Sequence, residues 1–239
     1  MYLVNNLSCE YSTCIQDVPF AGGKAHSGMA QAAYAMMESV IDDLIGARNQ
    51  SFPTYKIVIT GHSLGAGVAC LLSILLLKSM KLKDSELRCF AFAPPPVFEG
   101  PISNNINNTI LSFANIDDIV PHLCLYKVEK ALKRLLQLDS DPVDAYTRLS
   151  IILGFQKPSE TLLQATDTNS SLDLGSKVSL HRGKSVFPKL QVPGVIHILN
   201  NNGGVFKIDS KDFVETDIPM GTNAISEHLV NAYSSKIIT

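Results

Sequence analysis

The chain has 239 residues, of which 46% are hydrophobic and 18% are charged, and its formal net charge at pH 7 is −2. This length suits one large domain with a full core, and the lack of a basic excess argues against a nucleic-acid partner. The five cysteines have no metal-ligand spacing, and neither a secretory leader nor an apolar stretch of membrane length is visible. We therefore expect no metal site, no transmembrane segment in this chain, and a cytoplasmic location or a peripheral one on membranes.

The first recognisable pattern starts at His26. Residues 18–23 are expected to form a loop. From Ser27 onward, apolar residues recur at the 3.6-residue period of an amphipathic helix as far as Ile45. Gly46 is expected to cap the C-terminus of this helix.

The most informative stretch lies at residues 55–77. Residues 56–60 are a β-branched run typical of a buried strand, and an uninterrupted apolar helix pattern starts at Ala66. Between them stands a G-x-S-x-G pentapeptide made of Gly61, His62, Ser63, Leu64 and Gly65. A strand, a glycine-flanked serine and a helix in this order are typical of a nucleophile elbow, in which a strained turn exposes the serine hydroxyl. The pattern makes Ser63 a candidate nucleophile.

Two further strands are expected after the elbow, at residues 88–93 and 109–113. Their alternation with helical segments indicates parallel β-α-β units. In such sheets functional groups collect at the carboxyl ends of the strands. Ser63 and the pair Asp117 and Asp118 all come at such ends.

The second half of the chain has weaker patterns. We expect a polar loop at 103–108, then a basic amphipathic helix at 127–138 and a second helix at 142–155. A mobile loop is expected at 156–177. A hairpin of strands 195–199 and 205–208 and a terminal helix from 226 are expected to follow. We expect residues 1–239 to form a single α/β domain, with an inserted helical or mobile segment at about 124–190.

A serine hydroxyl is a poor nucleophile unless a histidine takes its proton, and that histidine needs a carboxylate to orient it. After an elbow of this kind the acid comes next in the chain and the histidine last. Asp117 or Asp118 meets the first demand, and His228 meets the second. His62, inside the pentapeptide, is expected to direct its ring elsewhere. The remaining histidines are less suited by position: His26, His122, His181 and His197.

Four motifs in order resemble the class 3 lipases, which are α/β hydrolases that cleave acylglycerols. They are H-S-G at 26–28, G-H-S-L-G-A-G at 61–67, F-A-P-P-P-V-F at 92–98 and N-I-D-D-I-V-P-H-L at 115–123. Two tail segments, P-G-V-I-H-I-L at 193–199 and I-S-E-H-L-V-N-A-Y at 225–233, are similar to the sn-1-specific diacylglycerol lipase branch. The resemblance implies an α/β-hydrolase fold, with a mostly parallel central sheet and helices on both faces.

The resemblance also implies roles for single residues. Ser63 matches the nucleophile and His228 the base. Asp118 matches the acid, because the family's acid directly precedes I-V-P. The backbone N–H of Leu64 matches one oxyanion donor, since the residue after the nucleophile supplies it. No cofactor is implied.

One departure from the family concerns the N-terminus. Family members carry a strand and a G-T-x-S-like loop upstream of the H-S-G segment, and this loop supplies the second oxyanion donor. Residues 1–24 contain no match, so the first strands are expected to be missing and the chain to be N-terminally truncated. Loss of one such donor costs on the order of 10²–10³ in rate, so the chain is expected to be weakly active or inactive.

The sequence thus predicts a serine lipase that hydrolyses diacylglycerol or triacylglycerol esters through an acyl-enzyme. Its acylglycerol or phospholipid substrate would be met at a membrane or lipid-droplet surface. Two alternatives stay open: a phospholipase A1 or carboxylesterase, and a catalytically impaired, lipid-binding member of the family.

Overall fold

The computed structural model describes residues 17–131, 171–173, 179–181, 187–219 and 223–238. Its centre is a five-stranded sheet in the order β10-β9-β6-β4-β3. Its strands are β3 (Ile57–His62), β4 (Leu87–Phe92), β6 (Ile110–Asn115), β9 (Val195–Leu199) and β10 (Val205–Ile208). The first four run parallel and β10 pairs antiparallel with β9. The predicted α/β class, the mostly parallel sheet and the predicted hairpin are confirmed.

Helix α3 (Leu64–Lys78) lies between the sheet and helix α1 (Ser27–Met36). Every residue from Ala66 to Leu76 is buried, which follows from an apolar run that has no polar face. Each large aliphatic side chain buried there contributes roughly 1.5–3 kcal/mol to stability. Gly67 lets α1 approach α3 closely, because a Cβ at this position would lie 2.4 Å from the sulfur of Met29.

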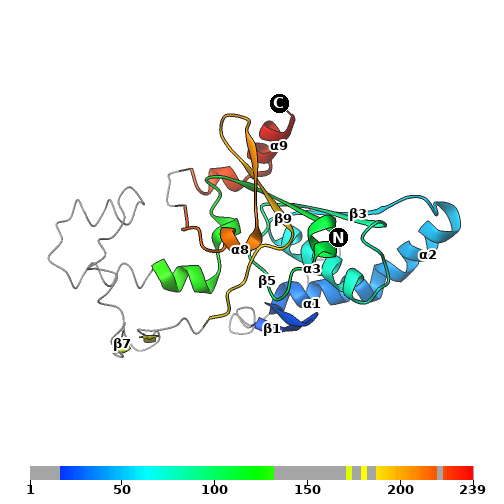
Figure 1. The fold of residues 1–239 in the computed structure, drawn as a ribbon, viewed down its shortest axis with the longest axis horizontal. Coiled ribbons are helices and arrows are strands. Elements are labelled where there is room, and N and C mark those ends of the chain that lie inside the picture. The colour runs from blue at the N-terminus through cyan, green and yellow to red at the C-terminus, as the bar shows by residue number, and fades with distance from the viewer. Residues whose placement is uncertain (1–16, 132–170, 174–178, 182–186, 220–222, 239) are drawn as a thin grey trace.

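Helix α1 continues through a π-helical segment, Met37–Ile41, into α2 (Asp42–Ser51), and together they form one long rod (Figure 1). The predicted helix end at Gly46 is therefore wrong. A glycine permits a helix end but does not force one. The helix stops at Ser51 because Pro53 disfavours helical geometry at Phe52, whose φ is −141°.

A second, smaller sheet contains β1 (Asp17–Phe20), β2 (Gly23–His26) and β5 (Phe98–Glu99), all antiparallel. The prediction of a loop at residues 18–23 is wrong. The side chain of Phe20 is buried and meets the ring of Phe98 edge-on, with centroids 6.3 Å apart. Strands β1 and β2 form a hairpin around Ala21 and Gly22, whose φ values of 46° and 87° are both positive. Only the pairing of β2 with β5 depends on a partner far along the chain.

The loop predicted at residues 103–108 is also corrected, because α4 (Asn104–Thr109) occupies it. Asparagine is a weak helix former. The helix is anchored by Ile106, which is buried in the main core. Tertiary packing therefore overrides the local preference.

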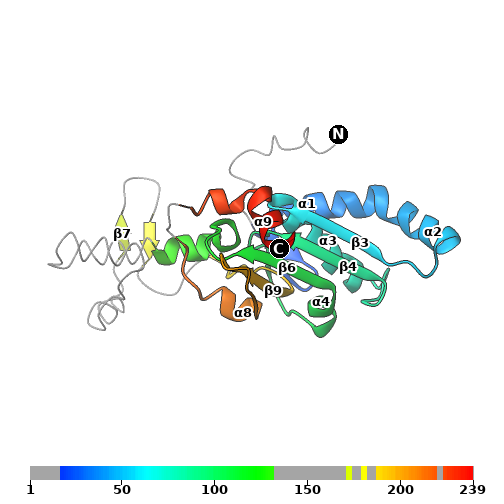
Figure 2. The same ribbon diagram turned by 90° about the horizontal axis from the view of Figure 1, so that it is seen from above.

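Helix α9 (Val230–Ile238) covers the face of the sheet opposite α3, so helices lie on both faces as predicted (Figures 1 and 2). Its residue Tyr233 packs in a cluster with Phe92, Phe113 and Leu199. The terminal helix was predicted to begin at 226, but residues Ser226–His228 form a 3₁₀ turn, η3, before α9 starts.

The remaining elements are η2 (Val120–His122), α8 (Ser210–Phe213) and a helix over residues 125–131. The helix predicted at 142–155 and most of the predicted insertion lie outside the described residues. Within that insertion, β7 (Ser171–Asp173) pairs antiparallel with β8 (Ser179–His181). Residues 171–173 were predicted as loop and are corrected to strand, because their backbone finds a pairing partner. None of the helices in the described part of the chain has the length and apolar character to span a membrane.

Candidate active site

Strand β3 and helix α3 meet at Ser63, whose backbone has φ 57° and ψ −127°. Such a conformation costs a non-glycine residue of order 1–3 kcal/mol and persists only where the surroundings enforce it. Here the N–H of Ser63 donates to the carbonyl of Phe92 at 2.9 Å, and the Ser63 carbonyl accepts from the N–H groups of Ala66 and Gly67. The backbone of Ser63 is thus fixed on both sides.

The two glycines of the pentapeptide differ in their surroundings. A Cβ on Gly61 would lie 2.4 Å from the carbonyl oxygen of Gly65, because strand and helix backbones pass each other there. A Cβ on Gly65 would meet nothing within 4 Å. Close backbone approach therefore requires glycine only at the first position. Leu64, the first residue of α3, has an N–H that lacks an intrahelical partner, as all first-turn amides do.

His228 comes from η3 and faces the serine. Its Nε2 lies 2.8 Å from Ser63 Oγ, and its Nδ1 lies 3.1 and 3.2 Å from the two carboxylate oxygens of Asp118. When Nδ1–H donates to the carboxylate, Nε2 is the nitrogen with the free lone pair that can accept the serine hydroxyl. Among the described residues, this arrangement brings Ser63, His228 and Asp118 into one hydrogen-bonded row.

Asp118 is fully buried and its carboxylate accepts two further hydrogen bonds. The N–H of Val120 donates to Oδ1 at 2.9 Å, and the hydroxyl of Tyr233 donates to Oδ2 at 2.6 Å. Tyr233 also accepts from the N–H of Asn115 at 2.9 Å. Burial, and then the neighbouring charge of Asp118, raises the pKa of the Tyr233 hydroxyl well above its ordinary value. The hydroxyl therefore remains a donor that compensates the buried carboxylate.

The ring of His62 was predicted to point away from the site, and this prediction is wrong. Its Nε2–H donates to the backbone carbonyl of His228 at 2.8 Å, and the two rings lie 4.9 Å apart between centroids. The residue before the nucleophile thus contacts the turn that carries the histidine. The ring of Tyr233 is also near, 6.0 Å from His62 and nearly perpendicular to it.

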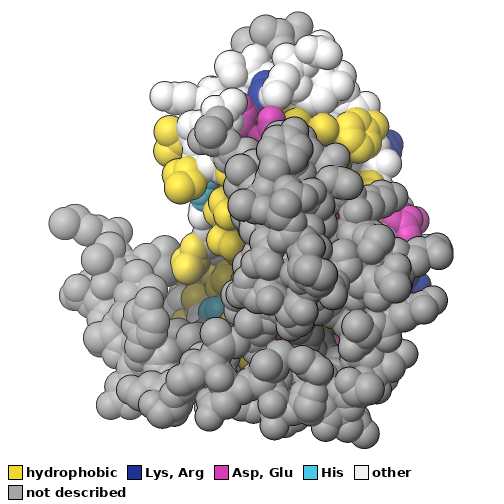
Figure 3. Space-filling view, turned by 90° about the vertical axis from the view of Figure 1, so that its left-hand side faces the viewer, with side chains coloured by type: hydrophobic (Ala, Val, Ile, Leu, Met, Phe, Trp, Pro, Cys, Tyr) yellow, Lys and Arg dark blue, Asp and Glu magenta, His cyan; other side chains and the backbone are white. Residues whose placement is uncertain are grey.

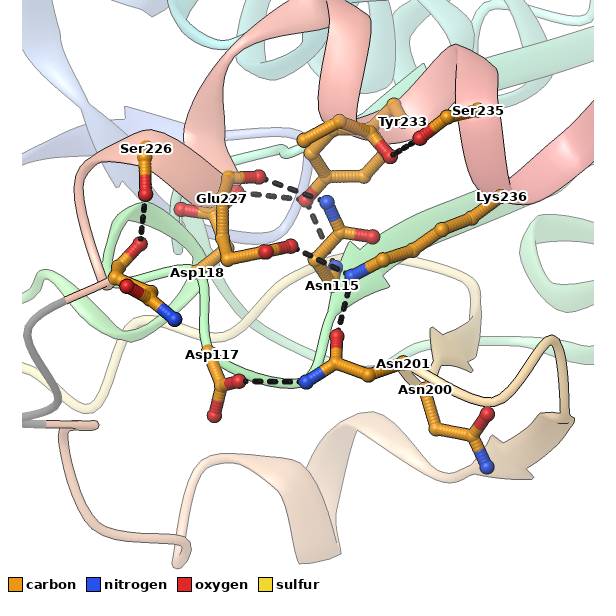
Figure 4. Close-up of polar contacts among 12 residues, drawn as sticks. Asn115, Asp117, Asp118, Asn200, Asn201, Ser226, Glu227, Tyr233, Ser235 and Lys236 are labelled. Atoms are coloured by element: carbon orange, nitrogen blue, oxygen red, sulfur yellow. Dashed lines mark hydrogen bonds and ion pairs between the residues drawn. The ribbon is translucent and has the colours of Figure 1, made fainter.

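The two neighbouring aspartates point in different directions (Figure 4). Asp118 faces Tyr233 and His228, whereas Asp117 accepts a hydrogen bond from the side-chain amide of Asn201 at 3.1 Å. The structure therefore places Asp118, and not Asp117, against His228, a choice that residue patterns alone left open.

His122 lies apart from Ser63, in a buried polar cluster. Lys127 Nζ is 2.9 Å from His122 Nδ1, 3.2 Å from the Phe213 carbonyl and 3.3 Å from Thr216 Oγ1. Burial, and then the Lys127 charge, lowers the pKa of His122 to about 3. Burial above all lowers the pKa of Lys127 to about 8. This histidine is therefore a neutral acceptor for the lysine.

Sequence reasoning missed Tyr233, His62 and Lys127 as polar partners. Tyr233 is part of the quoted tail motif at 225–233, but an aromatic residue on an amphipathic helix ordinarily indicates core packing. Nothing in the sequence indicated which residue the hydroxyl of Tyr233 would contact. Among the described residues, no three His, Cys, Asp or Glu side chains are grouped as metal ligands.

Comparison with known proteins identifies the family. Residues 2–128, more than half of the chain, match the model described as Lipase (class 3). The chain therefore belongs to the class 3 lipase family, whose members have the α/β-hydrolase fold. The resemblance predicted from the motifs is confirmed.

Two curated relatives and one solved structure illustrate the similarity. The chain is 31% identical over 143 residues to mouse (Mus musculus) diacylglycerol lipase-beta, over 57% of this chain and 20% of that protein. It is 29% identical over 109 residues to a lipase of Rhizomucor miehei, over 44% of this chain and 30% of that protein. A structure of Rhizomucor miehei triacylglyceride lipase aligns with TM-score 0.42 and 26% identity, over 46% of this chain and 44% of that chain. The chain thus spans less than a third of the length of these two curated relatives.

Proposed function

We propose that the chain is a serine hydrolase of acylglycerol esters, with Ser63 as nucleophile, His228 as base and Asp118 as acid. The observation that carries the proposal is the 2.8 Å contact between His228 Nε2 and Ser63 Oγ. This distance is within the range of a hydrogen bond, and a general base must first lie within such reach of the proton that it takes. The membership of the class 3 lipase family supports an ester of a lipid as the substrate.

The proposed reaction follows from these positions. Ser63 Oγ attacks the ester carbonyl while His228 Nε2 takes its proton, and Asp118 holds Nδ1–H and stabilises the imidazolium. His228 then protonates the departing alcohol, which leaves an acyl-enzyme on Ser63. Water attacks the acyl group while His228 takes its proton, and His228 then returns this proton to Ser63 Oγ as the fatty acid leaves. The N–H of Leu64 and the N-terminus of α3 favour the negative oxygen that forms in each step.

A lipid surface is the proposed place of reaction. Large hydrophobic side chains next to the proposed nucleophile and base are exposed, at 52% for Leu64, 77% for Ile225, 58% for Leu229 and 58% for Val230. In the space-filling view, hydrophobic side chains gather beside a histidine on the upper half of one face (Figure 3). Grouped exposed apolar side chains are typical of surfaces that bind partners or membranes. They support a substrate presented in a lipid aggregate.

The direct test is release of fatty acid from diacylglycerol dispersed in detergent micelles, compared with hydrolysis of a soluble short-chain 4-nitrophenyl ester. We expect turnover of both by the chain, and a loss of at least about 10³-fold in Ser63→Ala. Ile225→Ser should reduce turnover of the dispersed lipid more than that of the soluble ester, whereas Met80→Ser, at a position 88% exposed, is the matched control. Equal turnover by the chain and by Ser63→Ala would exclude the proposal.

A further inference from the structure

A chain of hydrogen bonds joins Asp117 and Glu227, the residues that directly precede Asp118 and His228 in the sequence (Figure 4). The side-chain amide of Asn201 donates to Asp117 Oδ2 at 3.1 Å. Lys236 Nζ donates to Asn201 Oδ1 at 2.8 Å and to Glu227 Oε2 at 2.6 Å. We call these four residues the outer chain.

The outer chain connects four separate elements of the fold. Asp117 lies in the loop after β6, directly before the proposed acid. Glu227 lies in η3, directly before the proposed base. Asn201 belongs to the turn between β9 and β10, and Lys236 belongs to α9. The proposed chemistry gives none of these four side chains a role.

The bridging amide is held by an ordered turn. The side-chain oxygen of Asn200 accepts from the backbone N–H groups of Asn202 and Gly204, at 3.0 and 2.6 Å. The N–H of Asn200 also donates to the Gly204 carbonyl at 2.9 Å. Because the turn is closed by these bonds, Asn201 starts from a fixed backbone position.

The Lys236–Glu227 pair is partly shielded from water, with side chains 14% and 18% exposed. Shielding from water strengthens such a pair relative to one on the open surface. Charge-assisted hydrogen bonds are also the stronger kind. Lys236 can therefore hold the Glu227 side chain against the Asn201 turn, while the Glu227 carbonyl accepts from the Asn115 amide at 2.7 Å.

We propose that Lys236 is a positioning residue for His228, acting through Glu227 on one side and through Asn201 and Asp117 on the other. The outer chain is one of the links between the two segments that carry the proposed base and acid, beside the backbone bond from Ile119 to Ala224. The Asn115 side-chain amide and His62 hold the backbone carbonyls of Glu227 and His228, and Lys236 adds a hold on the Glu227 side chain. A displacement of about 1 Å at a reacting group can cost on the order of 10²-fold in rate. This inference rests on the proposed function.

The test measures the rate of phosphonylation of Ser63 by a fluorophosphonate, together with kcat and KM for a soluble ester, in the full chain. Lys236→Met should lower kcat and the phosphonylation rate about 10-fold and leave KM within about twofold, because orientation and not substrate binding is lost. Lys236→Arg should restore both rates to within about threefold, since it keeps the charge and donors. Lys211→Met, at an exposed position of α8, is the matched control and should change neither.

A second set of variants distinguishes a role of Lys236 in positioning His228 from a role in the stability of the fold. In an Asp118→Asn background, Lys236→Met should lower kcat and the phosphonylation rate much less, because the effects of substitutions at coupled residues are not additive. If Lys236→Met does not fold, Asn201→Ala at the turn interrupts the same chain and should lower kcat about threefold. Equal phosphonylation of the chain and its folded Lys236→Met or Asn201→Ala variant overturns the inference, as does an undiminished effect in Asp118→Asn. No phosphonylation of the parent chain overturns the proposed function instead.

Discussion

At the scale of single residues, the two glycines of the G-x-S-x-G pentapeptide, Gly61 and Gly65, differ in what their surroundings require. Gly61 is required by a close approach of two backbones, which no rotamer change can relieve. Gly65 contributes its carbonyl to that approach but has open space where a side chain would stand. The motif therefore contains one glycine that the fold cannot replace and one that it can.

Two matched substitutions test this difference. Gly61→Ala should lower the free energy of unfolding by about 3 kcal/mol, since overpacking against backbone lies at the upper end of the usual 1–3 kcal/mol. Gly65→Ala should change it by no more than about 0.5 kcal/mol, because the added methyl meets nothing and alanine suits a helix. Chemical denaturation of both variants gives the comparison. Equal destabilisation by the two substitutions would show that the close approach is absent.

Tyr233 is the residue that most directly compensates the buried charge of Asp118. Tyr233→Phe removes one donor from the carboxylate and leaves the Asn115 N–H without its acceptor. We expect the free energy of unfolding to fall by about 1–3 kcal/mol and kcat on a soluble ester to fall about 10-fold, as the acid and base lose their alignment. Tyr55→Phe, at a position 64% exposed, is the control for loss of a tyrosine hydroxyl. Unchanged kcat in folded Tyr233→Phe would argue against this role.

Patterns could single out the residues of the proposed triad, Ser63, Asp118 and His228, but not the partners that hold them. Chain order and local context single out Ser63 and His228 as candidates, because an elbow and a late histidine are local features. The bond from Tyr233 to Asp118 spans more than a hundred residues and depends on how α9 is rotated against the sheet. For the same reason the ring of His62, adjacent to Ser63 in the chain, was predicted only to be directed elsewhere, and its contact with the turn that carries His228 was not predicted.

At the scale of elements, helices and strands with strong local patterns were predicted well and those with distant partners were not. Strand β3 and helix α3 follow from a β-branched run and an apolar run. Strands β1 and β2 form a local hairpin, and only β5 needs a partner from far along the chain, which is β2. Helix α4 is rich in asparagine and is stabilised by its buried Ile106, which no propensity scale indicates.

The helix over residues 125–131 is attached to α8 through buried Lys127, and this attachment has a pH signature. The pKa of Lys127 is about 8 in the folded chain against an ordinary value of 10.5. Between these two values the unfolded chain binds more protons, so stability should rise with pH across this window and stay flat on either side. The rise attributable to Lys127 is about 3 kcal/mol, at about 1.36 kcal/mol for each pKa unit.

The measurement is chemical denaturation at several pH values from about 7 to 11. The difference in free energy of unfolding between the parent chain and Lys127→Met should grow by about 3 kcal/mol as pH rises through the window. His122 stays a neutral acceptor throughout, because its pKa is about 3. Lys211→Met, at an exposed position of α8, should follow the parent chain. Parallel pH profiles for the parent and Lys127→Met would contradict a buried, perturbed lysine.

At the scale of the whole molecule, the fold brings together groups that are far apart in the chain. The elbow, the loop after β6 and the turn before α9 meet at the carboxyl ends of parallel strands, as the general rule for such sheets predicts. The family match over residues 2–128 contains Ser63 and Asp118, whereas His228 lies beyond it. The proposal of His228 as the base therefore rests on geometry and on the tail motif.

The central claim is that Ser63, activated by His228, is a nucleophile. Intact-mass measurement after treatment with a fluorophosphonate tests it most directly, because it needs no knowledge of the natural substrate. We predict one covalent adduct on the folded chain, none on Ser63→Ala, and labelling slowed by at least about 10²-fold in His228→Ala. Absence of an adduct on the folded chain, or an adduct that persists in Ser63→Ala, would contradict the claim.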